Sequence, residues 1–296
     1  MNILITGCNG QLGNEMQLLE KADNGNTYYN TDVAALDLPG RLPQKKLDIT
    51  DVEAIHQFIE ENQIDGIVNC AAYTAVDKAE ANEDLCQRLN AEAPAYLAAA
   101  IEARGGWMIQ ISTDYVFDGT NHTPYREDDD TCPNSTYGRT KLVGEFNVLK
   151  LCRRSMVIRT AWLYSIFGSN FVKTMIRLGK EKTELGVIFD QIGTPTYARD
   201  LAQAIMTVIR KGIEPGIFHF TNEGVTSWYD FTLAIHRLAG ITGCHVRPLH
   251  TSEYSTAAQR PPYSVLDKSK IKQTYAIEIP HWEQSLRECV AQLTAK

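Results

Sequence analysis

A tyrosine and a lysine four residues apart are the side chains best suited to acid–base chemistry in this sequence. They open and close the segment Tyr137-Gly138-Arg139-Thr140-Lys141. On a helix, positions i and i+4 share one face, so the phenol and the ammonium can reach the same substrate. A free tyrosine titrates near ~10, and a neighbouring ammonium lowers that pKa toward the working range of a general acid. Taken alone, the pair is also explained by a surface helix with an exposed lysine.

The position of this pair in the chain favours the chemical interpretation. The polar segment Ser112–Tyr115 follows the apolar run Trp107–Ser112, which is typical of a buried strand. A hydroxyl at the carboxyl end of that strand can hydrogen-bond both the substrate oxygen and the Tyr137 phenol. A glycine loop, a strand-end hydroxyl and a YxxxK helix, in that order, form a joint pattern that chance rarely supplies.

Three glycines near the N-terminus could hold a pyrophosphate. They form a GxxGxxG loop between a predicted strand, Asn2–Thr6, and a predicted helix, Gln11–Lys21. Glycine has no Cβ and tolerates positive φ, so the backbone can approach an anion closely. The helix N-terminus then offers free N–H groups and positive partial charge. The candidate cofactor contacts in the loop are Gly7, Gly10, Gln11, Leu12 and Gly13.

Other predicted strand ends could complete a dinucleotide site. Asp32 ends the second strand, where a carboxylate binds the adenosine ribose hydroxyls, although a turn aspartate would explain it too. A side chain after the third strand could flank the adenine, and small residues after the fourth would let the dinucleotide lie against the sheet. These candidates are Asp48, Ile49, Ala71, Ala72, Tyr73 and Thr74.

The carboxylate of Asp32 also bears on the choice of cofactor. It would accept hydrogen bonds from both ribose hydroxyls of NADH and repel the 2′-phosphate of NADPH. Arg41, Lys45 and Lys46 follow in a predicted loop and could offset this repulsion, but each exposed base contributes at most about 1 kcal/mol. The sequence therefore predicts that NADH is preferred and NADPH is used.

Strands and helices alternate through the first half of the chain, which predicts a parallel sheet. We expect an α/β fold, a doubly wound Rossmann-type sheet with a smaller, partly helical C-terminal substrate domain. Residues 1–162 and 198–221 are assigned to the dinucleotide-binding domain, and residues 163–197 and 222–296 to the substrate domain. A binding crevice is expected beyond the carboxyl ends of the strands, at the switch point of the sheet.

Composition excludes several classes of protein. The formal net charge is -7 and no basic stripe is present, which argues against a nucleic-acid partner. The acidic run Glu127–Asp130 is interpreted as a solvated loop, and no metal is expected. Seven scattered cysteines suit a reducing compartment. Without a signal peptide or a long apolar segment, the expected location is the cytoplasm, with no membrane partner.

With these residues in hand, the chain resembles the extended short-chain dehydrogenases, and within them the dTDP-4-dehydrorhamnose reductases. The resemblance covers nearly the whole chain, and its longer motifs are more specific than the glycine loop. They are Met1–Gly7 with Gly10–Gly13, Asn69–Glu80, Ser112–Gly119, Pro133 with Tyr137–Lys141, Arg159–Tyr164, Asn170-Phe171 and Arg260-Pro261.

The resemblance implies a reaction and a role for each matching residue. The reaction is reduction of the C4 ketone of dTDP-4-dehydro-6-deoxy-L-mannose to dTDP-L-rhamnose by NADH or NADPH. Tyr137 would protonate the C4 oxygen, Lys141 would tune it and hold the ribose, and Thr113 would be their hydroxyl partner. The implied substrate contacts are Asp114 on the sugar hydroxyls, Trp162 and Asn170 in the pocket, and Arg260 on the diphosphate. Ordinary packing would also explain Trp162, and a surface ion pair Arg260.

One departure from the family bears on assembly. Some members dimerise through magnesium held by acidic residues, of which Glu15 survives here, whereas Arg199 stands where they have an acid. The resemblance with this departure implies a monomer or a dimer without metal. Two alternative functions stay open: a nucleotide-sugar epimerase or dehydratase that retains NAD, and a non-catalytic regulatory subunit.

Overall fold

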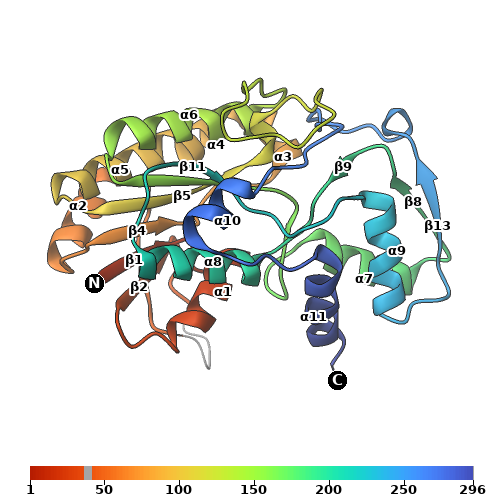
Figure 1. Ribbon diagram of the computed structural model, residues 1–296, viewed down its shortest axis with the longest axis horizontal. Helices are drawn as coiled ribbons and strands as arrows, with labels where there is room; N and C mark the ends of the chain where they lie inside the picture. The colour runs from red at the N-terminus through yellow and green to blue at the C-terminus, as the bar shows by residue number, and fades with distance from the viewer. Residues whose placement is uncertain (37–41, 296) are drawn as a thin grey trace.

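A seven-stranded parallel sheet forms the centre of the molecule (Figure 1). The computed structural model describes residues 1–36 and 42–295. The strand order is β11-β6-β5-β4-β1-β2-β3, and every neighbouring pair is parallel. The order reverses between β1 and β4, which confirms the predicted doubly wound fold. The strands are β1 (Asn2–Thr6), β2 (Thr27–Asp32), β3 (Gln44–Lys46), β4 (Gly66–Asn69), β5 (Trp107–Thr113), β6 (Ser155–Thr160) and β11 (Gly216–His219).

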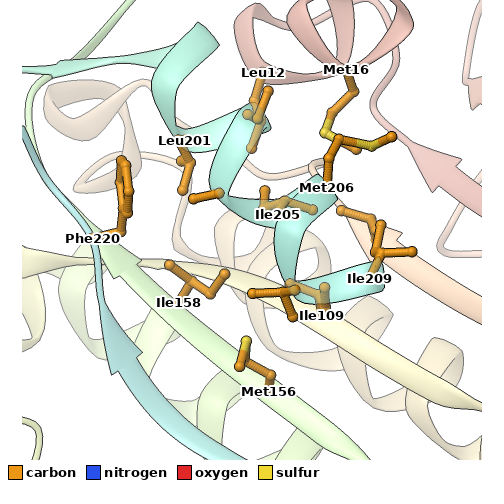
Figure 2. Packing of buried hydrophobic residues seen from close by; sticks show 14 of the residues in the cluster. Leu12, Met16, Ile109, Met156, Ile158, Leu201, Ile205, Met206, Ile209 and Phe220 are labelled. Carbon is orange, nitrogen blue, oxygen red and sulfur yellow. The ribbon is translucent and has the colours of Figure 1, made fainter. Parts of the chain in front are cut away.

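Helices cover one face of this sheet through a large apolar cluster. They are α1 (Gln11–Glu20), α8 (Ala198–Lys211) and α10 (Ser269–Tyr275). Leu201, Ile205 and Ile209 recur every four residues along α8, so one side of that helix is apolar and buried. Figure 2 shows this side packed between α1 and the strand residues Ile109 and Ile158. The cluster fixes α1, and with it the glycine loop, against the sheet.

A second set of helices covers the opposite face: α2 (Val52–Glu61), α5 (Ala93–Ala103) and α6 (Thr136–Leu151). The long helix predicted over Glu83–Arg104 is interrupted. It consists of α4 (Glu83–Gln87), a π-helical segment (Arg88–Glu92) and α5. Within that segment Asn90 bonds the backbone of Tyr73 at 2.8 and 3.1 Å, and this lateral bonding accompanies the widened turn.

The remaining elements gather around a separate apolar cluster beside the sheet (Figure 1). The cluster includes Tyr164, Val172, Phe231 and Leu286. Its helices are α7 (Phe171–Glu181), α9 (Trp228–Leu238) and α11 (Trp282–Thr294). Three two-stranded sheets accompany them: β7 (Leu163–Tyr164) with β10 (Thr196–Tyr197), β9 (Ile192–Gly193) with β12 (Thr226–Ser227), and β8 (Glu184–Ile188) with β13 (His245–Leu249).

The domain assignment stays a prediction, and one element complicates it. Helix α10 falls within residues 222–296, yet Ile271 and Tyr275 pack into the cluster on the main sheet. Among residues 1–36 and 42–295, no helix is both long and apolar enough to cross a membrane.

Candidate active site

A cavity of about 730 Å³ opens at the carboxyl ends of the central strands. It lies where the sheet order reverses, the position at which doubly wound folds bind ligands. Most of the candidate residues line it: Gly7, Gly10, Gln11, Leu12, Asp32, Ile49, Ala71, Ala72, Thr74, Thr113, Asp114, Tyr137, Lys141, Trp162 and Asn170. The structure therefore brings the glycine loop and the YxxxK pair together in one cavity. Four other candidates are placed outside its lining: Gly13, Asp48, Tyr73 and Arg260.

Two glycines of the loop stand where any larger residue would collide with neighbouring backbone. Gly7 has a φ of +65°, and a Cβ there would lie 2.6 Å from the backbone nitrogen of Ala71. A Cβ at Gly13 would lie 2.4 Å from the carbonyl oxygen of Gly7. Gly13 thus serves the packing of loop on helix instead of facing the cavity. Gly10 precedes α1 without a side-chain cap, which leaves its first N–H groups available to an anion.

Asp32 ties the second strand to this loop. Its carboxylate accepts hydrogen bonds from the backbone nitrogens of Asn9 at 3.0 Å and Val33 at 2.9 Å. The side chain lines the cavity, as a ribose-binding carboxylate would. Asp48 has a local role instead, because its Oδ1 accepts from the backbone nitrogen and the hydroxyl of Thr50.

Helix α6 directs the YxxxK pair toward the cavity. Its first turn is capped by Ser135, whose hydroxyl accepts the Gly138 N–H at 3.1 Å. Lys141 is buried and donates to the carbonyl oxygen of Ile111 at 2.6 Å. Burial lowers the pKa of Lys141 to about 8, and the charge of Glu145 opposes that shift. The ammonium is therefore held at the end of β5 and partly desolvated.

The pKa of Tyr137 shifts in the direction opposite to the prediction. Burial raises it above the usual value, the nearby carboxylate of Asp114 adds to the increase, and a hydrogen bond with Thr113 counteracts it. The expected lowering by Lys141 is wrong for this state of the protein. A buried phenol that loses contact with water resists ionisation, and the ammonium is engaged with Ile111.

Thr113 and Asp114 form a hydrogen-bonded pair beside the phenol. The Thr113 hydroxyl donates to Asp114 Oδ1 at 3.0 Å and accepts from the backbone nitrogen of Tyr115 at 3.2 Å. Burial raises the pKa of Asp114 to about 6, although hydrogen bonds from Ser264 and Thr113 lower it. The site therefore combines a phenol, a hydroxyl and a carboxyl group within one buried corner.

Trp162 and Asn170 occupy the side of the cavity nearer the second apolar cluster. The indole of Trp162 stacks on that of Trp228, with ring centroids 3.5 Å apart and planes inclined by 10°. Asn170 caps α7 by accepting the Lys173 N–H at 3.1 Å, and it donates to Gln11 at 3.0 Å. Its amide thus links the loop before α7 to the glycine loop, a role that the sequence did not indicate.

Arg260 is paired with a carboxylate. Its guanidinium binds Asp77 in bidentate fashion, at 2.7 and 3.0 Å, and Asp77 also accepts from the backbone nitrogen of Ala258. The expected diphosphate contact stays a prediction. The guanidinium nitrogens that would bind phosphate oxygens here bind the carboxylate of Asp77. A diphosphate would therefore have to share or displace Asp77.

A buried ion pair beneath the cavity escaped the sequence analysis. Glu145 accepts from the Ser112 hydroxyl at 2.5 Å and from Arg159 at 2.7 and 3.0 Å. Both charged side chains are at most 2% exposed. The available signal was the spacing, because Glu145 stands four residues after Lys141 on the same face of α6. Other cavity residues that were missed include Val33, Leu47, Cys70, Ile111 and Tyr115.

Glu15, the acidic residue considered for metal, faces inward. It is 1% exposed and accepts from the Ser165 hydroxyl at 2.5 Å. Burial raises the pKa of Glu15, the charge of Arg199 lowers it, and that of Asp200 raises it. This environment suits a hydrogen-bonded carboxyl group inside the fold.

The family model described as RmlD substrate binding domain matches residues 1–295. The chain belongs to this family. Curated relatives of the RmlD family include the dTDP-4-dehydrorhamnose reductase of Escherichia coli (strain K12), which is 38% identical over 99% of this chain and 98% of its own length. The spore coat polysaccharide biosynthesis protein SpsK of Bacillus subtilis (strain 168) is 38% identical over 97% and 95%.

Solved structures agree with this assignment to the RmlD family. A dTDP-4-dehydrorhamnose reductase from Clostridium acetobutylicum is 44% identical, with a TM-score of 0.91 over the whole of both chains. A Bacillus anthracis dTDP-4-dehydrorhamnose reductase in complex with NADP is 36% identical, with a TM-score of 0.89 over 98% of this chain and 99% of its own.

Proposed function

We propose that the protein reduces the C4 ketone of dTDP-4-dehydro-6-deoxy-L-mannose to dTDP-L-rhamnose, with NADH or NADPH as reductant. The observation that carries this proposal is the single cavity lined by the glycine loop at one end and by Tyr137, Lys141 and Thr113 at the other. Curated relatives named dTDP-4-dehydrorhamnose reductase, such as that of Burkholderia thailandensis at 36% identity over 100% of both chains, support the choice of sugar.

The residues present fit a dinucleotide. Gly7 and Gly10 line the cavity, a Cβ at Gly7 would collide with the backbone of Ala71, and the uncapped N-terminus of α1 follows Gly10. Gly7, Gly10 and Gln11 would hold the pyrophosphate, Asp32 a ribose, and Ala71 and Ala72 the flat surface at the strand end. When bound, a reduced nicotinamide supplies a hydride.

The chain's own residues supply the proton and the geometry. Tyr137 donates the proton to the C4 oxygen. Its phenol is protonated at neutral pH, because tyrosine ordinarily titrates near ~10 and burial raises the pKa of Tyr137 further. Thr113 hydrogen-bonds the same oxygen, and Asp114 binds sugar hydroxyls. Lys141, which here donates to the carbonyl oxygen of Ile111, would hold the nicotinamide ribose, and its charge would stabilise the phenolate left on Tyr137.

The direct test is consumption of NADH or NADPH in the presence of dTDP-4-dehydro-6-deoxy-L-mannose. We expect catalytic oxidation with at least one of the two cofactors. An absence of oxidation with both would refute the proposal. The rival is an epimerase or dehydratase with retained NAD, which Asp114 beside Thr113 keeps open. An ultraviolet spectrum of the purified protein separates the two, because only the rival retains a cofactor.

The environment of Asp32 supports a preference for NADH. Lys45, a base that could offset its charge, donates to Asn62 at 2.8 Å and lies over the Tyr29 ring at 5.2 Å. The register of β2 and β3 sets Lys46 opposite Asp32, but Lys46 is exposed, which limits its effect to at most about 1 kcal/mol. Arg41 lies outside the described residues. The NADP complex of the Bacillus anthracis relative is consistent with use of both cofactors.

Asp32→Asn tests this preference, because it keeps a hydrogen-bond acceptor for the glycine loop while removing the charge. The ratio of kcat/KM for NADH to that for NADPH is expected to fall about tenfold, since loss of one close charge repulsion corresponds to about 1.4 kcal/mol. A wild-type preference for NADPH, or an unchanged ratio in the variant, would assign the choice to other contacts.

The assembly and location belong to the same proposal. We place the enzyme in the cytoplasm as a monomer or a dimer without metal, binding neither nucleic acid nor membrane. The buried setting of Glu15 supports assembly without a metal, and the scattered cysteines of the sequence suit a reducing compartment. Its mass in solution should be unchanged by a chelator of divalent cations. A chelator-dependent drop in mass would contradict it.

A further inference from the structure

Trp162 has a backbone conformation that bulky residues rarely adopt. Its φ is +50°, in the left-handed region. The other described non-glycine residues with positive φ, Gln63 and Ala276, follow the ends of helices α2 and α10, where such a conformation commonly terminates a helix. Trp162 instead lies between β6 and β7 and lines the cavity. Strained residues persist where their surroundings fix them, and they concentrate at ligand sites.

Two neighbours constrain the indole of Trp162. Trp228 stacks on it with centroids 3.5 Å apart. A Cβ at Gly193 would come within 2.7 Å of its six-membered ring, so only glycine leaves room there. The carbonyl oxygen of Trp162 accepts the Thr196 N–H at 3.2 Å, which fixes the backbone.

Trp228 is itself anchored in the second apolar cluster. It begins α9, whose cap Ser227 accepts the Asp230 N–H at 3.0 Å. The preceding strand β12 pairs with β9, which places Thr226 opposite Gly193. The ring of Phe171 packs against Trp228 with centroids 4.5 Å apart. Trp228 does not line the cavity, so it acts on a ligand through its neighbours, and the indole that stacks on it, Trp162, lines the cavity directly.

We propose that Trp228 is a positioning residue for the sugar-nucleotide pocket: its stack holds Trp162 in the left-handed conformation and thereby sets affinity for the sugar nucleotide. The inference rests on the proposed function. The Trp162 end of the cavity is the substrate end, because the Ser264 hydroxyl lies beside Gly193 and interacts with Asp114. The glycine loop contacts the residue after Trp162, because Gln11 donates to the Leu163 carbonyl oxygen at 3.4 Å. Cofactor affinity should therefore depend on the stack less strongly than sugar-nucleotide affinity does.

A double-mutant cycle with Trp162→Ala and Trp228→Ala tests the proposal. In Trp228→Ala, the KM for the ketosugar and the Kd for dTDP-L-rhamnose are expected to rise about tenfold, the upper range for loss of an aromatic pair. The kcat should change less than about twofold, and the KM for NADH should rise less than the KM for the ketosugar. In the Trp162→Ala background, Trp228→Ala should add less than about twofold, because coupled residues are not additive.

Two variants serve as controls. Trp282→Phe alters another tryptophan of the same cluster, 5.7 Å from Phe231, and should leave both constants unchanged. Trp228→Phe keeps an aromatic face and should restore most of the affinity. If Trp228→Ala does not fold, as judged by circular dichroism, Trp228→Leu takes its place in the cycle. Unchanged affinity in a folded variant, or additive effects of the two substitutions, would overturn the proposal.

Failure of the proposed function would be seen separately. In that case the wild type would neither reduce the ketosugar nor bind dTDP-L-rhamnose. The same double-mutant cycle can be measured by thermal unfolding without ligand. The unfolding temperatures of the variants would still show whether Trp162 and Trp228 interact. Coupling between the two substitutions would support the positioning role, and strict additivity would overturn it.

Discussion

At the scale of single residues, burial dominates the acid–base properties of the site. It raises the pKa of Tyr137 and lowers that of Lys141 to about 8. Both shifts favour the neutral form, as expected for groups removed from water. A protonated phenol is what a ketone reduction requires of its acid. The charged form of Lys141 must then stabilise the phenolate that forms on Tyr137.

Tyr137→Phe removes the proton donor with little change in volume. Turnover should fall about 10²-fold or more, the usual contribution of a positioned acid, while the cofactor Kd stays the same. Steady-state kinetics and cofactor titration measure the two effects. Tyr254→Phe, at a tyrosine that is 54% exposed, is the control and should behave as the wild type. Near-normal turnover in Tyr137→Phe would remove it from the mechanism.

We predict that the pKa of Lys141 sets the alkaline limit of activity. Since the charged form is needed, kcat/KM should decline as the pH rises through about 8. The groups that act on this ammonium are Glu145, Cys86 and Cys70, and all three favour its charged form. Lys141→Arg keeps the charge to higher pH and should remove the decline even if its overall rate is lower. A decline that persists unchanged in Lys141→Arg would assign it to another group.

The sequence predicted residues that line the cavity better than it predicted their partners. Tyr137, Lys141 and Thr113 follow from residue type and spacing along one or two elements. The partner of Arg260 does not, because Asp77 lies 183 residues away and meets it only in the folded chain. The direction of the Tyr137 shift likewise depends on burial, which spacing does not reveal.

At the scale of elements, the close approach of α6 to the end of β5 places the acid. A Cβ at Gly138 would lie 2.2 Å from the carbonyl oxygen of Tyr115. This position follows Tyr137 directly, so any displacement of the helix moves the phenol. Helix α6 therefore packs directly against the short 3₁₀ helix Asp114–Val116, which contains Tyr115, and this contact fixes its position.

Gly138→Ala should force α6 away from this contact. We expect turnover to fall by about 10-fold to 100-fold, since small misplacement of a reacting group can cost this much. Gly243→Ala is the matched control, because nothing lies within 4 Å of a Cβ there. Activity assays and thermal unfolding of both variants separate misplacement from loss of stability. Full activity in Gly138→Ala would show that the contact is not needed.

Most strands and helices could be predicted from periodicity, and the exceptions have physical reasons. Strand β3, with the sequence Gln44-Lys45-Lys46, has no apolar residue and lies at the edge of the sheet. It forms through its pairing with β2, which no local pattern signals. The π-helical segment Arg88–Glu92 likewise accompanies the bonds between Asn90 and Tyr73 instead of a helix-breaking residue.

At the scale of the whole molecule, the cavity lies between two apolar clusters with separate tasks. The cluster on the sheet fixes the glycine loop through α1, and the second cluster supports Trp162 through Trp228. Asn170 connects the two by donating to Gln11. The proposed cofactor and substrate contacts thus come from different parts of the chain, and both sets line the cavity that contains Tyr137.

Transfer of deuterium from labelled cofactor tests the central claim most directly. The enzyme is given dTDP-4-dehydro-6-deoxy-L-mannose and NADH or NADPH in which both hydrogens at C4 of the nicotinamide are deuterium, and the product sugar is analysed by mass spectrometry and NMR. We predict one deuterium at C4 of dTDP-L-rhamnose for each cofactor oxidised, and a strongly reduced yield with Tyr137→Phe. A product without deuterium at C4, or no oxidation of either cofactor, would contradict the account.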